Sequence, residues 1–362
     1  MMLLLLTAMH FCVDGVCAAV MAAYAVSEPF FEPIMFHFGL YNLIAFAGQA
    51  PTGLLLDRRP RAVPFALVFS AAALLLGMTA APRILWQTVA LGLGNCAFHA
   101  AAGRLVLCRY EGFAAPGIFV SSGAVGLGLG LNRLLGAPLF FAADVIATGL
   151  VFWLSRQGSD ERTVFPAAEA ERSARAGMGA NAAIFGTNAE VLGERLSARA
   201  VMTLPVCAFL LLACVVLRGF GGGSATALGM MLPCVMAAGK CLGGLVCDRV
   251  GYRNTLLLIF LLSFVALRGA GTAFALLLTL AFNMTMALTL RLAHWCAPTM
   301  PGLMFGLAAG CLLPGVFFAG ALTIPPAAMA AVQFLALFFA GLLMRRAYPG
   351  EAVIPDEGRV RP

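Results

Sequence analysis

Charged side chains are scarce in this sequence of 362 residues. Asp, Glu, Lys and Arg together make up 11% of it, against about a quarter in an average soluble domain. Hydrophobic residues make up 62%, and the mean hydropathy is +0.95. A soluble fold of this size needs many more polar side chains to cover its surface. The scarcity of charge therefore excludes a soluble globular protein and predicts a polytopic membrane protein.

Paired cysteine motifs are also lacking, although the chain contains 11 Cys. These cysteines stand singly, almost all inside apolar runs, and never as C-x-x-C. This pattern is typical of Cys used as a small apolar side chain, so we expect neither a disulfide framework nor a zinc site. The N-terminus, MMLLLLTAMHFCVDG, lacks a basic region and a cleavage site. We expect it to be the first span rather than a signal peptide.

Sequence motifs of enzymes are missing as well. The chain has no H-E-x-x-H of a zinc protease and no G-x-S-x-G of a nucleophile elbow. The run GLGLGL at 126–131 imitates a dinucleotide-binding fingerprint, but it lies inside an apolar segment with no strand before it. We therefore expect no enzymatic activity, no cofactor and no bound metal.

Long apolar segments are what the sequence does contain. Twelve of them approach the length of about 20 residues that a helix needs to cross a hydrocarbon layer of about 30 Å. The sequence thus predicts an all-α membrane fold of twelve transmembrane helices in two six-helix halves. The expected spans are 2–24, 34–56, 62–80, 84–107, 114–134 and 136–155, then 200–218, 224–247, 253–270, 271–292, 301–321 and 324–344.

A polar stretch divides the twelve segments into two groups. Residues 156–199 are rich in charge, Ala, Gly and Ser, which is the composition of a linker and not of an enzyme domain. The expected organisation is an N-terminal half over 1–155, a cytoplasmic linker over 156–199, a C-terminal half over 200–346 and a cytoplasmic tail over 347–362.

Basic residues fall unequally on the two sides of this predicted bundle. With the N-terminus inside, the outer side receives four Arg, the cytoplasmic side receives 18, and Lys240 lies within a span, which accounts for all 23 basic residues. Because Lys and Arg concentrate on the cytoplasmic side, both termini are expected there, and the net charge of +7 does not indicate nucleic acid. The four outer residues are Arg83, Arg133, Arg218 and Arg268.

Two segments repeat each other at an offset of 191 residues. They are AGQAPTGLLLDRRPRAV at 47–63 and AGKCLGGLVCDRVGYRN at 238–254, each at the cytoplasmic end of the second span of its half. Parallel repeats of this kind are the architecture of one class of transporters. The matched positions are Gly53 with Gly244, Asp57 with Asp248, Arg58 with Arg249, and further along Asn95 with Asn283.

The repeated segments resemble the G-x-L-x-D-R-x-G-R signature of the major facilitator superfamily. The resemblance extends over the whole chain, because the span count and the linker position agree with it. The first copy departs from the signature, with Pro60 in place of the second Gly and the last Arg displaced to Arg61. The resemblance implies transport of a small molecule by alternating access, with the signature loops as gates. These gating candidates are Gly53, Asp57, Arg58, Arg61, Gly244, Asp248, Arg249, Gly251 and Arg253.

The physical chemistry of the signature is consistent with a gate. Gly53 and Gly244 allow another helix to approach closely. Asp57 and Asp248 lie at the membrane edge, where a carboxylate can face an Arg or the positive N-terminus of a neighbouring helix. A contact that exists in only one conformation acts as a gate. The alternative is that the signature arginines only anchor helix ends on the cytoplasmic side.

Ionisable residues at membrane depth are functional candidates. Asp14 lies near the middle of the first span, and His10 lies one turn earlier on the same helical face. A carboxylate beside an imidazole is suited to exchanging a proton. The resemblance adds that the first span of each half lines the central cavity. Asp14 and His10 are therefore the proton-coupling candidates, while Asp144 belongs to an outer gate or a solvated vestibule.

Polar residues of the fourth and tenth spans are candidates for lining a substrate cavity. They are Asn95 and His99 in the first half and Asn283 and Thr285 in the second. The alternative is that the two Asn residues hydrogen-bond neighbouring helices, at about 0.6 kcal/mol each. Lys240, the only Lys, is expected to extend toward the cytoplasmic interface.

The predicted function is a secondary active transporter in the plasma or inner membrane, multi-pass and monomeric, with lipid, a small-molecule substrate and H⁺ as its partners. The glycine-rich stretch at 123–130 resembles antiporters of the superfamily, and the chain as a whole resembles its drug-efflux and fosmidomycin-resistance members, which implies export. An uptake permease for a metabolite and a non-transporting receptor or assembly factor remain alternatives.

Overall fold

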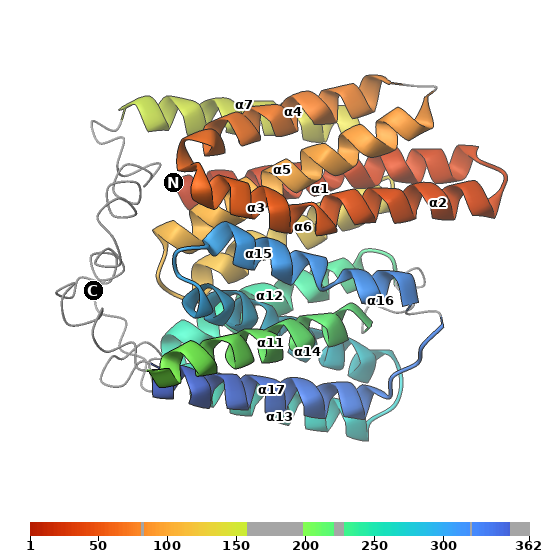
Figure 1. Cartoon of the computed structure of the whole chain (residues 1–362). Helices are drawn as coiled ribbons and strands as arrows, with labels where there is room; N and C mark the ends of the chain where they lie inside the picture. Colours follow the sequence, from red (N-terminus) through yellow and green to blue (C-terminus); the bar gives the residue numbers. More distant parts are fainter. Residues whose placement is uncertain (81–82, 158–197, 221–227, 319–320, 348–362) are drawn as a thin grey trace.

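The structure is a computed structural model that describes residues 1–80, 83–157, 198–220, 228–318 and 321–347, and every regular element in these ranges is helical (Figure 1). The N-terminal half contains α1 (Met2–Ser27), α2 (Phe31–Asn42), η1 (Leu43–Ala47), α3 (Gln49–Arg58), η2 (Pro60–Ala62), α4 (Val63–Thr79), α5 (Ile84–Arg109), α6 (Ala114–Leu131) and α7 (Ala137–Gln157). The C-terminal half contains α11 (Ala198–Phe220), α12 (Met231–Val250), α13 (Tyr252–Arg268), α14 (Thr272–Cys296), α15 (Pro301–Gly310), α16 (Leu313–Phe318) and α17 (Pro326–Ala347).

The all-α polytopic membrane fold is confirmed. Nine helices among the described residues are long and apolar enough to cross a membrane. The other three expected spans are occupied by helices that are shorter or interrupted: 34–56 by α2, η1 and α3, 253–270 by the 17-residue α13, and 301–321 by α15 and α16. The predicted linker and tail fall almost entirely on 158–197 and 348–362, which lie outside the described residues.

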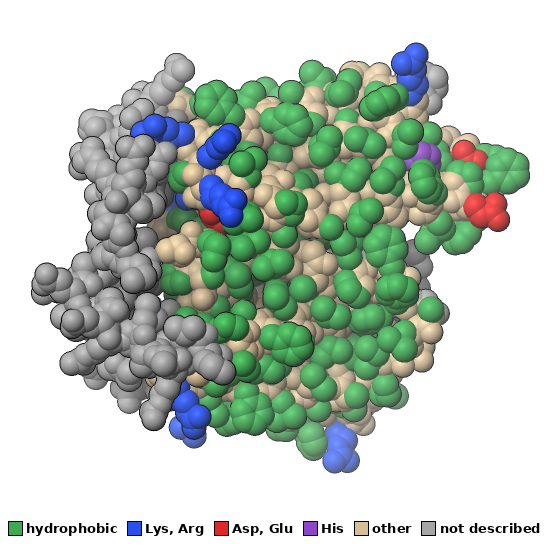
Figure 2. Space-filling view, in the orientation of Figure 1, with side chains coloured by type: hydrophobic (Ala, Val, Ile, Leu, Met, Phe, Trp, Pro, Cys, Tyr) green, Lys and Arg blue, Asp and Glu red, His purple; other side chains and the backbone are tan. Residues whose placement is uncertain are grey.

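The outer surface of the bundle is apolar over both halves (Figure 2). Aromatic side chains such as Phe65 and Phe209 expose 75% and 70% of their area. Basic side chains lie at the ends of the helices and not along their sides, as the figure shows. Such a surface is suited to the apolar interior of a membrane.

The helices form two bundles that lie side by side, α1 to α7 above and α11 to α17 below in Figure 1. One buried cluster includes Leu67, Leu91 and Phe98 of the first bundle, and a second includes Leu256 and Leu337 of the second bundle. Each half therefore buries an apolar core of its own. The first cluster also receives residues from the second half, so the two bundles share a packed interface.

Two interrupted helices face each other across this interface. Pro51 has no N–H, so it cannot donate to the carbonyl of Ala47, and the chain widens there into the π-helical turn η1. The side chain of Gln49 donates to the carbonyl of Ala45 at 2.7 Å and satisfies one of the displaced groups. In the partner helix Pro314 follows the break between α15 and α16, and α15 and α16 both contact η1.

Candidate functional site

A cluster of polar side chains occupies the middle of the N-terminal half. Asp14 of α1 keeps 18% of its side chain exposed, and His10, one turn earlier, keeps 6%. Gly123 of α6 lies directly against both side chains, and a Cβ atom there would collide with His10 Nε2 and Asp14 Oδ2. Glycine at this position therefore allows α6 to pack on the charged face of α1.

Helix α5 completes the cluster with two side chains. Asn95 Nδ2 donates to Asp14 Oδ1 at 3.0 Å. His99 Nε2 lies 3.5 Å from the same carboxylate oxygen and 2.9 Å from His10 Nε2. His10 Nε2 lies 3.3 Å from Asp14 Oδ2. We refer to His10, Asp14, Asn95 and His99 as the His–Asp cluster.

The tautomers of the two histidines follow from their backbone contacts. His10 Nδ1 lies 2.8 Å from the carbonyl of Phe119, and His99 Nδ1 lies 2.9 Å from the carbonyl of Asn95. A carbonyl only accepts hydrogen bonds, so both Nδ1 atoms are the donors. In two neutral rings both Nε2 atoms would then carry lone pairs that face each other beside a carboxylate. One additional proton, shared between these nitrogens, turns this repulsion into a hydrogen bond.

The same atoms offer the ligand types of a metal site. The ligand atoms of His10, Asp14 and His99 lie within 4.8 Å of one another, and each imidazole donates its other N–H to a backbone carbonyl, as metal-bound His does. Two nitrogens bound to one tetrahedral zinc at about 2.0 to 2.1 Å would be about 3.3 Å apart. The observed separation of 2.9 Å is shorter and has the length of a hydrogen bond. The geometry therefore suits a shared proton better than a metal.

The residues predicted to line a cavity in the second half are placed differently. Asn283 donates to the carbonyl of Thr279 on its own helix at 2.9 Å. Thr285 accepts from Nη1 of Arg218 at 3.3 Å, and Thr289, one turn further, lies 3.5 Å from the same nitrogen. Neither Asn283 nor Thr285 is among the residues of the His–Asp cluster.

The sequence assigned Arg218 to the outer side, and the structure places it in the last turn of α11. Arg218 lies within α11, where only 8% of it is exposed, and its Nη2 atom is buried without a hydrogen-bond partner. The sequence placed it outside because it follows the last apolar run of its span. Lys240 is half-buried on α12, which packs against both α6 and α14.

Both signature carboxylates bind helix N-termini of the opposite half. Asp57, at the end of α3, accepts from the backbone N–H of Gly302 and Leu303 at 3.0 and 2.8 Å, where α15 begins. Asp248, at the end of α12, accepts from the N–H of Phe113 and Ala114, both at 2.8 Å, where α6 begins. The dipole and the free N–H groups of a helix N-terminus favour such an anion.

The signature glycines permit these crossed contacts. A Cβ atom on Gly53 would collide with the carbonyl of Gly302, and one on Gly244 would collide with the carbonyl of Phe113. Gly251 ends α12 with φ of 84°, a left-handed conformation that favours glycine. The first copy has Pro60 there and turns through η2 instead.

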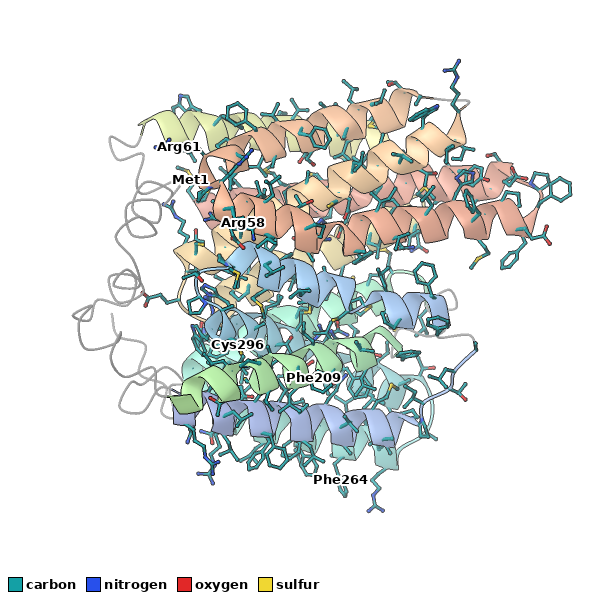
Figure 3. All side chains as sticks on the ribbon, in the orientation of Figure 1. Met1, Arg58, Arg61, Phe209, Phe264 and Cys296 are labelled. Carbon is teal, nitrogen blue, oxygen red and sulfur yellow. The ribbon has the colours of Figure 1, made fainter. Side chains whose placement is uncertain are left out.

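Arginines at this end of the bundle divide into exposed and buried ones. The signature arginines Arg58, Arg61, Arg249 and Arg253 are exposed, and Figure 3 shows Arg58 and Arg61 at the same end as Met1. The arginine that contacts a signature carboxylate is Arg104 of α5, whose Nε donates to Asp57 Oδ1 at 3.0 Å. The sequence did not select it, because α3 and α5 are distant along the chain.

Arg291 of α14 is the counterpart of Arg104 in the second half. It is 1% exposed and extends across the interface to the end of α5. Its guanidinium donates to the carbonyls of Leu107 and Gly112, each at 3.1 Å, and to that of Tyr110. These carbonyls lie in the last turn of α5 or just beyond it, where no further helical N–H can donate to them. Arg291 donates to them instead and so joins the two halves.

Comparison with known proteins gives fold likeness only. No protein-family model matches the chain, and no curated protein matches it. Among solved structures, the proton:xylose symporter XylE of the major facilitator superfamily, bound to 6-bromo-6-deoxy-D-glucose, is similar to this chain over 96% of its length and 94% of the symporter chain. The two sequences are 13% identical, and the TM-score is 0.47.

Proposed function

We propose that the protein is a proton-coupled secondary active transporter of the major facilitator type, which moves a small molecule by alternating access. The observation that carries this proposal is the pair of crossed contacts at one end of the bundle. Asp57 of the first half holds the start of α15, and Asp248 of the second half holds the start of α6. Each contact joins the halves and closes the end that we expect to face the cytoplasm.

Opening this end requires both carboxylates to leave their helix N-termini. Each hydrogen bond to a charged group contributes about 1.5 to 3 kcal/mol, so the four N–H contacts bias the bundle toward the closed arrangement. Water can replace these contacts when the halves separate, because all of the groups lie at the membrane edge. The crossed contacts thus form a gate that has two stable states.

In this proposal the coupling ion is H⁺, and the His–Asp cluster binds it. The shared proton lies between His10 and His99, and Asp14 balances its charge. Movement of one proton through a membrane potential of 100 mV contributes about 2.3 kcal/mol. Loss or gain of the proton changes the charge at the middle of the bundle and thereby the relative stability of the two gated states.

The glycines of α6 carry no information on the direction of transport. Gly126 and Gly130 allow α6 to contact the backbone of α1, and Gly128 allows it to contact Pro233 of α12. Close packing therefore accounts for these glycines, and the proposal holds for import and for export.

Solute-driven proton flux tests the proposal. The purified protein is reconstituted into vesicles that contain a pH-sensitive dye, and sugars, amino acids, organic acids and drugs are added outside. We expect at least one class of solute to change the internal pH. Asp14→Asn is expected to abolish that flux, because the cluster loses the charge that balances its proton. Asp144→Asn is the matched control, since Asp144 is buried in the same half and lies outside the cluster.

Two outcomes would contradict the proposal. If a solute binds the wild-type protein and no proton moves, the protein is a receptor or an uncoupled carrier. If Asp14→Asn and Asp144→Asn reduce the flux equally, the coupling site is not the His–Asp cluster.

A further inference from the structure

Two cationic side chains lie in the interior of the second half, and neither is paired with a carboxylate of that half. Arg218 is 8% exposed, and its contacts through Nη1 are long ones to the hydroxyls of Thr285 and Thr289. Its Nη2 atom is fully buried and has no hydrogen-bond partner among the described residues. A guanidinium at membrane depth with an unused donor is costly unless an anion offsets it.

The second half has no acid to serve this purpose. Within 198–220, 228–318 and 321–347, Asp248 is the one acidic residue. Its carboxylate already accepts from the N–H groups of Phe113 and Ala114 at the gate. Lys240, half-buried on α12, adds a second positive charge to this half. Two like charges thus share this region, and each raises the cost of the other.

The acid that faces these cations belongs to the first half and is already engaged. Lys240 lies on α12, which packs against α6, and Gly123 of α6 lies directly against His10 and Asp14. Asp14 also contacts His10 and accepts a hydrogen bond from Asn95. When the His–Asp cluster holds its proton, the two halves together present an excess of positive charge at the middle of the bundle.

We propose that the transported molecule is an anion whose acidic group, a carboxylate or a phosphoryl group, binds between Arg218 and Lys240. This inference rests on the proposed transport function and adds the chemical class of the substrate. The planar guanidinium of Arg218 can hold two oxygens of such a group, and Lys240 supplies a point charge beside it. The unused Nη2 donor of Arg218 is then satisfied by the ligand.

The arrangement also links the anion to the proton. Lys240 lies on α12, which packs against α14, the helix that Arg218 contacts, and against α6, the helix that covers His10 and Asp14. An anion bound at Arg218 lowers the electrostatic cost of a proton on the cluster, and by reciprocity the proton favours the anion. Anion and proton are thus expected to bind together.

Ligand-induced stabilisation tests the substrate class. Melting temperatures of the purified protein are measured with benzoate, succinate and inorganic phosphate, and with benzamide and succinamide at the same ionic strength. A ligand that binds only the folded state raises the melting temperature, and the stabilisation grows with the logarithm of one plus the ratio of free ligand concentration to Kd. At least one anion is expected to stabilise the wild-type protein, and the amides are not. Arg218→Gln and Lys240→Met are expected to lose at least tenfold in affinity for that anion.

Arg268→Gln is the matched control, because Arg268 is exposed and lies over the ring of Phe264 at the protein surface. A wild-type protein that responds to none of the anions, or equally to acids and amides, overturns the inference. The same holds if Arg268→Gln weakens the anion response as much as Arg218→Gln does.

Proton flux in vesicles separates this inference from the proposed function. Amides that drive proton flux as well as acids do would contradict the anion site and leave proton-coupled transport intact. Anions that stabilise the wild-type protein through Arg218 and drive no proton flux would confirm the anion site and contradict proton coupling.

Discussion

At the residue scale, the His–Asp cluster depends on which ring nitrogen of each histidine carries the proton. Backbone carbonyls fix the Nδ1 donors of His10 and His99, and this leaves two Nε2 atoms 2.9 Å apart. If one Nδ1 atom were not held as a donor, its ring could carry its own proton on Nε2 and donate it to the other ring. The two rings would then need no additional proton between them. The peptide backbone of α5 and α6 is thus part of the proposed proton site, although it carries no charge.

Substitution of His99 tests this dependence. In His99→Gln the nitrogen that shares the proton with His10 is lost, so we expect solute-driven proton flux to fall by about tenfold or more. The free energy of unfolding is expected to fall by only about 1 kcal/mol, the contribution of a typical hydrogen bond. His37→Gln is the control, because His37 is also buried and contacts the hydroxyl of Thr88 at 3.1 Å. Equal losses of flux in both variants would rule out a specific role for His99.

The sequence predicted part of this cluster. The spacing of His10 and Asp14 on one helix was sufficient to pair them as proton-coupling candidates. Asn95 and His99 were selected as well, but for a substrate cavity, because no local pattern shows that α5 lies against α1. The distance of 89 positions between His10 and His99 is bridged only in the folded bundle.

At the element scale, the interruptions in two facing helices are the main departure from the predicted spans. Hydropathy predicts one continuous span over 34–56, because it cannot detect the backbone hydrogen bond that Pro51 removes. The structure places η1 against the break between α15 and α16. Helix interruptions at matching heights are suited to bending when one half moves against the other.

Restoring the missing donors tests this bending. Pro51→Ala and Pro314→Ala each return an N–H to the backbone and are expected to make the helices more regular. We expect transport to slow several-fold, while the melting temperature is unchanged or higher, since each new hydrogen bond contributes about 1 kcal/mol. Pro205→Ala is the control, because Pro205 lies inside α11, away from the facing interruptions. Unchanged transport rates in Pro51→Ala and Pro314→Ala would show that the breaks do not bend during transport.

At the scale of the whole molecule, the two halves are held together at one end by reciprocal contacts. The sequence selected Asp57 and Asp248 from their repetition, and both make these contacts; their role as a gate stays a proposal. The sequence left open whether these carboxylates face an arginine or a helix N-terminus. In the structure both bind helix N-termini, and the arginine that joins Asp57 is Arg104 rather than a signature arginine. Those partners lie at the ends of other helices, and only the arrangement of the halves reveals them.

Loss of the gate carboxylates is expected to shift the bundle toward an arrangement open at this end. Asp57→Asn and Asp248→Asn each weaken two charge-assisted hydrogen bonds, so the ratio of open to closed protein is expected to rise by about tenfold or more. Cys108 is half-buried close to Asp57 and Arg104 and reports the change. Its alkylation by a water-soluble reagent, measured by mass spectrometry of the labelled peptide, is expected to accelerate.

Glu32→Gln provides the control for alkylation, because Glu32 is an exposed acid of α2 that makes no contact with the gate. If Cys108 reacts at the wild-type rate in both Asp57→Asn and Asp248→Asn, the carboxylates do not hold this end closed.

The reciprocity of the gate has a consequence for the history of the chain. Each half offers a carboxylate at the end of one helix and receives its partner's carboxylate at the start of another. An interface in which both sides give and receive the same contact is what two identical subunits related by a two-fold axis make. A single half paired with a second copy of itself would close in the same way, so this reciprocity is what duplication and fusion of one half would produce.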